Sequence, residues 1–307
     1  MPLPRLWYRL GIPILRCPVF AVALKAGSTP TYVLSDLETS SKLELVPQRG
    51  GIATRWQVAE QDILYFDEAR FADPSLSVRG GIPILFPICG NLPDNQYTLD
   101  GQTYTLKQHG FARDLPWQAT DQATTDAASL TLTLESSAET LAQYPFAFTL
   151  SFTFVLCGYH LELRQRFTNR SDRAMPFSTG LHPYFEVKDK TQLEFDLPAT
   201  EFQNHLTGQA ETFGGQFDFS QPEIDLAFQN LTAPVATVTD RHLGRQLTLT
   251  WDDAYTRLVF WTVQGKDYYC LEPWTAPRNA MNSGDSLLVI APQQTLETSV
   301  RMTITLL

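Results

Sequence analysis

The stretch that decides the fold runs from Phe146 to Leu156 and reads FAFTLSFTFVL. Large apolar side chains occupy every second position in it, with Thr149, Ser151 and Thr153 between them. A period of two is the spacing of side chains on one face of a β-strand, whereas a helix repeats about every 3.6 residues. The stretch therefore predicts a long strand with one face buried in a core.

The same alternation recurs along the rest of the chain. Further strands are expected at residues 130–134, 160–167, 247–251 and 300–306. Clusters of turn-forming residues separate such stretches, as at residues 92–95, 169–172 and 282–285. We find no amphipathic helix longer than about three turns and no regular alternation of strand with helix. The chain is therefore expected to be all-β, a large antiparallel β-sandwich.

Apolar stretches are spread from end to end, and no repeat, low-complexity tract or linker divides the chain. We expect residues 1–307 to form a single domain, since all-β sandwiches often exceed about 200 residues.

Charge and cysteine content narrow the classes of function. The chain carries 33 acidic residues against 23 Lys plus Arg, a net charge of −10. Nucleic acid would be repelled, whereas a small anion held by local arginines stays compatible with this balance. Cys17, Cys89, Cys157 and Cys270 have no paired spacing, so we expect reduced thiols in a cytoplasmic protein.

Membrane association is not expected. No stretch approaches the roughly 20 apolar residues of a membrane span. The apolar run at residues 19–24 follows three arginines, but it is too short and too close to prolines for a secretory signal.

The chain has five histidines, and two of them stand among residues suited to a site. His182 lies between a glycine and a proline in STGLHPYF (178–185), where it is either a poised proton donor or a structural histidine. His109 lies in QHGFAR (108–113), which is either a loop that contacts a ligand or an ordinary hairpin turn. The other three, His160, His205 and His242, are interpreted as surface residues.

Glu272 and Arg79 are further candidates. Glu272 follows the apolar run YYCL (268–271) and precedes Pro273, so it is either a base with a raised pKa beside aromatic rings or a solvated strand-end carboxylate. Arg79 heads RGGIPILFP (79–87), which lacks the lysine of a phosphate loop; the arginine either binds hydroxyls or a phosphate, or caps a buried strand.

Other reaction classes have little support. The sequence has no GxSxG, HExxH or strand-following GxGxxG motif, and no cysteine paired with a nearby histidine. A glycosidase would need two carboxylates across a cleft, for which Glu272 and Asp225 could be proposed, but sequence does not give their separation.

Taken together, these segments closely resemble the aldose 1-epimerase family, and within it the branch that acts on hexose 6-phosphates. The matching pieces occur in the family's order from about Tyr32 onward, including RGG (49–51), and are RGGIP (79–83), QHGFAR (108–113), LHPYF (181–185), EID (223–225) and LEP (271–273). The resemblance therefore covers residues 31–307 and leaves residues 1–30 as an N-terminal segment without a counterpart.

The resemblance implies a β-supersandwich and a set of site residues. His182 matches the family's catalytic acid and Glu272 its catalytic base. Arg79, Gln108, Arg113 and Asp225 would bind substrate, with His109 beside them. In the branch that handles free galactose the histidine follows an asparagine; here Leu181 precedes it, which favours the sugar phosphate branch.

The implied reaction interconverts the α and β anomers of a hexose or hexose 6-phosphate by opening and reclosing the ring. A base takes the proton of the C1 hydroxyl while an acid protonates the ring oxygen, so no metal or other cofactor is required. We expect a monomer whose partner is a small sugar or sugar phosphate. The alternative is a non-catalytic sugar-binding or sugar-sensing protein that keeps the same cleft.

Overall fold

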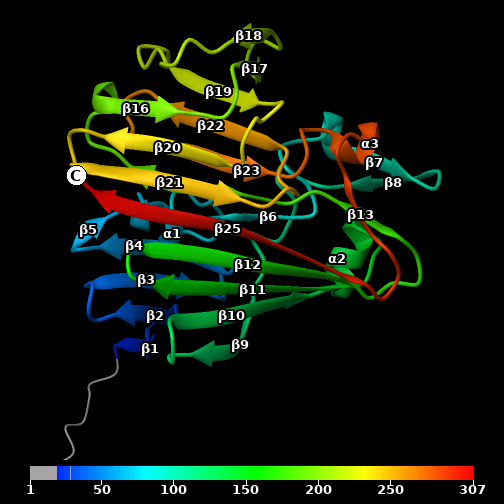
Figure 1. Ribbon diagram of the computed structural model, residues 1–307. Helices are drawn as coiled ribbons and strands as arrows, with labels where there is room; N and C mark the ends of the chain where they lie inside the picture. The colour runs from blue at the N-terminus through cyan, green and yellow to red at the C-terminus, as the bar shows by residue number, and fades with distance from the viewer. Residues whose placement is uncertain (1–18, 28) are drawn as a thin grey trace, which may run out of the picture.

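The computed structural model describes residues 19–27 and 29–307. Strands dominate the described chain, and all of the pairings between its named strands are antiparallel (Figure 1). The predicted all-β class is therefore confirmed. Within these residues no helix combines the length and the apolar character that crossing a bilayer requires.

The first sheet holds five strands in sequence order. They are β1 (Phe20–Lys25), β2 (Thr31–Asp36), β3 (Ser41–Val46), β4 (Ile52–Val58) and β5 (Gln61–Asp62). Strand β1 belongs to the N-terminal segment whose packing the sequence left open, and it pairs with β2 along its whole length. Residues 1–18 and 28 of that segment, Cys17 among them, lie outside the described residues.

A second sheet has eight strands and spans the front of the molecule in Figure 1. In spatial order they are β16 (Leu193–Asp196), β20 (Val235–Asp240), β21 (Arg245–Trp251), β25 (Thr295–Leu306), β12 (His160–Asn169), β11 (Phe148–Cys157), β10 (Ala128–Glu135) and β9 (Gln118–Ala123). The four additional strands expected from the alternation all lie in this sheet.

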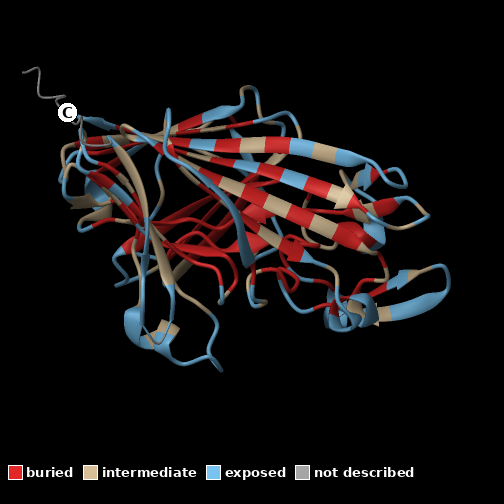
Figure 2. Ribbon diagram, turned by 90° about the horizontal axis from the view of Figure 1, so that it is seen from below, coloured by how far each residue is buried: buried red, intermediate tan, exposed pale blue. Residues whose placement is uncertain are grey.

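Strand β11 shows why the alternating pattern forms this sheet. Its residues alternate between buried and partly exposed, and Phe152 and Phe154 are fully buried. Figure 2 shows such alternating bands of burial along the long strands of the molecule. On the other face, the hydroxyls of Thr131 and Thr153 pair across the strands at 2.8 Å. Phe146, expected in the strand, is buried just before its start.

A third sheet carries the site described below. Its order is β18 (Ala210–Thr212), β17 (Glu201–Asn204), β19 (Glu223–Phe228), β22 (Arg257–Val263), β23 (Tyr268–Trp274), β14 (Gly180–Leu181) and β6 (Ile84–Leu85), and β15 (Tyr184–Glu186) also pairs with β23. Phe86, directly after β6, packs against Phe148 and Phe167 of the second sheet, with ring centroids 5.1 and 6.1 Å away. This aromatic contact joins the two large sheets.

The remaining elements are short. They are the strand pairs β7 (Gln96–Leu99) with β8 (Gln102–Thr105) and β13 (Met175–Phe177) with β24 (Leu288–Ile290), the helices α1 (Glu68–Ala72), α2 (Ala138–Gln143) and α3 (Ala280–Ser283), and the 3-10 turns η1 (Pro93–Asn95) and η2 (Lys190–Gln192). The expectation of no long helix is met in the described residues. The turn expected at residues 282–285 begins inside α3.

Candidate functional site

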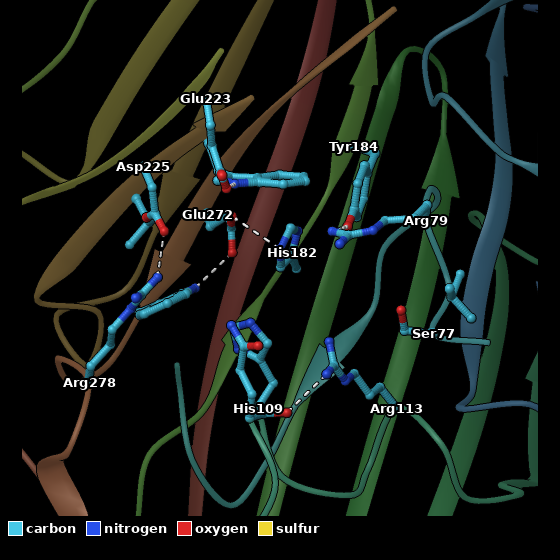
Figure 3. Close-up of a pocket in the computed structure, with 15 residues that line it drawn as sticks. Ser77, Arg79, His109, Arg113, His182, Tyr184, Glu223, Asp225, Glu272 and Arg278 are labelled. Atoms are coloured by element: carbon cyan, nitrogen blue, oxygen red, sulfur yellow. Dashed lines mark hydrogen bonds and ion pairs between the residues drawn. The ribbon is translucent and has the colours of Figure 1, made fainter. Parts of the chain in front are cut away.

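One pocket over the third sheet brings together all seven residues singled out from the sequence. Its volume of about 220 Å³ is several times the roughly 30 Å³ that one water molecule occupies in the liquid. The seven are Arg79, Gln108, His109, Arg113, His182, Asp225 and Glu272, and Figure 3 labels all of them except Gln108. They come from segments far apart in the chain, which the sheet order places side by side.

His182 and Glu272 face each other in the middle of this pocket. Nε2 of His182 lies 3.4 Å from Oε1 of Glu272, and both side chains are almost fully buried. The other carboxylate oxygen, Oε2, accepts a hydrogen bond of 3.1 Å from the indole of Trp274. Glu272 is therefore not the solvated strand-end carboxylate considered above, since it lies within β23 on a continuously buried strand.

The backbone around His182 follows from its neighbours in the sequence. The histidine directly follows β14, and its N–H donates to the carbonyl of Pro83 at 3.0 Å. Pro183, which follows it, restricts the histidine to extended conformations. The imidazole stacks on Tyr184 with ring centroids 4.8 Å apart, so the ring plane is fixed while Nε2 points to Glu272.

The protein shifts the two pKa values in opposite directions. Burial, followed by the negative charge of Asp225, raises the pKa of Glu272 well above its ordinary value. Burial, followed by the positive charges of Arg113 and Arg79, lowers the pKa of His182 to about 3. In both cases burial disfavours the charged form of the group.

His109 is a neutral hydrogen-bonding residue at the edge of the pocket. Its ring Nδ1 accepts a hydrogen bond of 3.1 Å from the backbone N–H of Gly90, and the backbone N–H of His109 donates to the carbonyl of Gly90 at 2.7 Å. Burial lowers its pKa well below the usual value. The remaining proton is therefore on Nε2. Gly110, in the same loop, admits the backbone of Phe86, since a Cβ there would lie 2.2 Å from the Phe86 carbonyl oxygen.

Arg79 and Arg113 supply positive charge at one end of the pocket (Figure 3). Arg79 donates to the Tyr184 hydroxyl at 3.4 Å and lies over the ring of Trp261, whereas Arg113 donates to the carbonyl of Gln108 at 2.9 Å. Neither guanidinium has an ion pair with a carboxylate of the described residues; the nearby Asp114 pairs with Lys107. Burial lowers the pKa of Arg113, and the charge of Arg79 adds to this effect. This end of the pocket is suited to an anion.

Asp225 lies at the opposite end, with both carboxylate oxygens engaged. Oδ1 lies 2.7 Å from Nδ1 of His205, and Oδ2 accepts from Arg278 at 2.6 Å. The interpretation of His205 as a surface residue is wrong, because its side chain is only 10% exposed. His160 and His242 are exposed as expected. A carboxylate held on both sides is poorly suited to be the second group of a glycosidase.

Several residues of the pocket escaped the sequence analysis. Trp274, Tyr184 and Trp261 enclose the His182 and Glu272 pair, and Glu223 accepts a hydrogen bond from Trp261 at 2.7 Å. Arg278 completes the end at Asp225. The segment EPWTAPRN (272–279) contained a detectable signal for two of them, since a tryptophan and an arginine follow a candidate base within seven positions.

A group of possible metal ligands overlaps the pocket. Ligand atoms of His182, Cys270 and Glu272 all lie within 4.8 Å of one another. The charges of Arg79 and Arg113, which disfavour a proton on His182, would equally oppose a metal cation there. Burial also raises the pKa of the Cys270 thiol well above its usual value, so the thiolate that a metal needs is unfavourable. Cys89, Cys157 and Cys270 all carry free thiols.

Comparison with known proteins assigns the chain to a family. The sequence profile described as Aldose 1-epimerase matches residues 39–303, nearly the whole chain. This chain belongs to the aldose 1-epimerase family. Membership of this family implies a sugar ligand. The observed all-β fold agrees with this membership.

Relatives and solved structures support the family and its fold. Protein LacX of Lactococcus lactis subsp. lactis is 26% identical over 244 residues, which are 70% of this chain and 80% of LacX. An Escherichia coli K12 protein with the provisional name glucose-6-phosphate 1-epimerase is 28% identical over 183 residues, 55% of this chain and 56% of that protein. The crystal structure of the Slr1438 protein from Synechocystis sp. PCC 6803 has a TM-score of 0.90 and 45% identity, covering 94% of this chain and 99% of that chain.

Proposed function

We propose that the protein is an aldose 1-epimerase that interconverts the α and β anomers of a hexose 6-phosphate. The observation that carries the proposal is the buried contact of 3.4 Å between His182 Nε2 and Glu272 Oε1, in a pocket with two arginines at one end. An acid and a base on one anomeric centre are what ring opening requires.

The proton transfers balance without any further reactant. Glu272 as carboxylate takes the proton of the C1 hydroxyl, the bond between C1 and the ring oxygen breaks, and C1 becomes an aldehyde. His182 as imidazolium gives its Nε2 proton to the ring oxygen, which becomes the C5 hydroxyl. Rotation about the bond between C1 and C2, then reclosure with the transfers reversed, gives the other anomer.

The opposed pKa shifts fit this cycle. A carboxylate with an imidazolium and a carboxylic acid with an imidazole differ only in the position of one proton, so the pair passes between these states during ring opening. The protein alone favours the neutral state, which is the one that accompanies the open-chain aldehyde. A phosphate near Arg79 and Arg113 would offset the two charges that suppress protonation of His182. Substrate would thereby raise the pKa of the acid as it binds.

The choice of a phosphorylated sugar rests on charge. Arg79 and Arg113 are partly buried and lack carboxylate partners among the described residues, and arginine binds phosphate well through its planar fork of donors. The likeness to the E. coli protein adds support, since its provisional name refers to glucose 6-phosphate.

The test is anomerisation of fresh α-glucose 6-phosphate followed by polarimetry, with the spontaneous rate subtracted. Glu272→Gln and His182→Asn should each lose most of the catalysed rate, because removal of a positioned acid or base costs roughly 10² to 10⁴-fold. Circular dichroism should show an unchanged fold. A near-full rate in either variant would rule out the assigned roles.

A non-catalytic sugar-binding protein is separated by the same experiment. It would bind sugar in calorimetry without accelerating mutarotation in the wild type. The direct contact of His182 with Glu272 favours the enzyme, since binding alone requires no acid and base at hydrogen-bonding range.

A further inference from the structure

We propose that Arg278 is a specificity residue that binds the hydroxyl on C2 of the sugar, the carbon next to the reacting centre. This inference rests on the proposed aldose 1-epimerase function. Arg278 lines the pocket and was not among the residues singled out from the sequence.

The position of Arg278 is prepared by the backbone around it. Gly90 has a φ of +69°, and a Cβ there would lie 2.2 Å from Cγ of Arg278. Only glycine leaves room for the arginine to cross this turn. The guanidinium then reaches Asp225, to which Nη2 donates at 2.6 Å. This ion pair holds the guanidinium at its end of the pocket, which Arg278 lines.

The order of strands fixes the order of chemical groups along the pocket. Across the sheet the strands follow in the order β19, β22, β23, β14 and β6. Asp225 lies on β19 and Glu272 on β23. His182 directly follows β14, and Arg79 lies before β6. Neighbouring strands lie about 4.8 Å apart. The pocket therefore presents an Asp–Arg ion pair, then the base, then the acid, and then the pair of arginines, an order that Figure 3 also shows.

A chain of side-chain contacts gives the same order. Arg79 contacts Tyr184, on which His182 stacks, and His182 faces Glu272. Beyond Glu272, the series continues through Trp274 and His205 to the ion pair of Asp225 with Arg278.

A hexose 6-phosphate carries its groups in a matching sequence. C1 lies between C2 and the ring oxygen, and the ring oxygen is bonded to C5, which bears the phosphorylated C6. With Glu272 at the C1 hydroxyl and His182 at the ring oxygen, the phosphate falls on the side of Arg79. The C2 hydroxyl falls on the side of Arg278. The reverse orientation would bring the phosphate against the carboxylate of Asp225, whose charge already neutralises Arg278.

The ion pair is chemically suited to a hydroxyl. A hydroxyl both donates and accepts, and here it meets a carboxylate acceptor beside a guanidinium donor. A sugar that lacks the C2 hydroxyl would leave these partly buried charged groups without that partner. Sites built to hydrogen-bond a substrate hydroxyl reject the analogue that lacks it strongly.

The experiment compares kcat/KM for glucose 6-phosphate and 2-deoxyglucose 6-phosphate, each corrected for spontaneous anomerisation. The wild type should prefer the 2-hydroxy sugar about 10 to 100-fold, the range expected for a hydrogen bond to a charged group. Arg278→Met should lose most of this preference, and Arg278→Lys should keep part of it because the charge remains. Arg113→Met is the matched control, since it should weaken both phosphorylated sugars equally and leave the ratio unchanged.

The inference would be overturned if Arg278→Met kept the wild-type ratio of kcat/KM for the two sugars. It would also be overturned if this ratio changed in Arg113→Met and stayed the same in both Arg278 variants. If Arg278→Met does not fold, Arg278→Lys decides the question. If the wild type accelerates neither sugar, the proposed function fails. The ratio of calorimetric affinities for the two sugars in wild type and variants then tests Arg278 separately.

Discussion

The indole of Trp274 should control how readily Glu272 acts as a base. Its N–H donates to Oε2 of Glu272 at 3.1 Å, and both residues are about 1% exposed. Trp274→Phe keeps an aromatic ring in the strand but removes this donor. A hydrogen bond to a charged group contributes about 1.5–3 kcal/mol, and one pKa unit corresponds to about 1.36 kcal/mol.

The sign of the effect follows from the form that the indole stabilises. The N–H bonds to the carboxylate more strongly than to the acid, so its loss should raise the already elevated pKa of Glu272 by about one to two units. At a given pH less of the base is ionised. We expect kcat/KM below that pKa to fall about 10 to 100-fold, and its acidic limb to move to higher pH by the same one to two units.

The assay is the pH dependence of kcat/KM for anomerisation, measured for wild type and for Trp274→Phe. Trp251→Phe serves as the control, because Trp251 is also buried but lies on β21 of the second sheet. If the pH profile of Trp274→Phe is unchanged, whatever its absolute rate, this hydrogen bond does not determine the pKa of Glu272.

Three further outcomes are expected. Arg113→Ala should raise KM for glucose 6-phosphate much more than for free glucose; equal effects on both would contradict the assigned phosphate role. Gly90→Ala should displace Arg278, reduce the preference for the 2-hydroxy sugar and lower Tm, because a residue with a Cβ costs about 1–2 kcal/mol in the left-handed region even without the clash. Phe152→Ala should lower the free energy of unfolding by about 3–5 kcal/mol in denaturant titrations, since the ring is fully buried between Trp117 and Phe167. A loss below about 1 kcal/mol would show that β11 is not central to the core.

The fold was predictable because its decisive signal is local. The alternation around Phe152 identifies a half-buried strand without reference to any other part of the chain. The burial of Glu272 was harder to predict, since its strand β23 is covered on one side by β14 and β15, which lie far away in the sequence. The residue types of the site could be named, but the opposed pKa shifts of His182 and Glu272 depend on a burial that only the packed sheets produce.

His205 and Arg278 show where sequence reasoning ended. His205 lies in a polar stretch that is typical of a surface turn, yet it bonds to Asp225, which is 20 positions away. Arg278 reaches the same carboxylate from 53 positions away, over a turn that Gly90 makes possible. Neither contact leaves a periodic or local pattern, because both arise where loops meet the end of β19.

The residues of the pocket come from two kinds of backbone, and this affects how substrate preference can change. The acid and base are attached to hydrogen-bonded strands, whereas Ser77, Val78 and Arg278 come from connecting segments. Connecting segments tolerate substitution and changes of length far better than paired strands do. Exchange of the loops between members of the family should therefore transfer sugar preference while the proton chemistry is retained. The two properties can then be engineered separately.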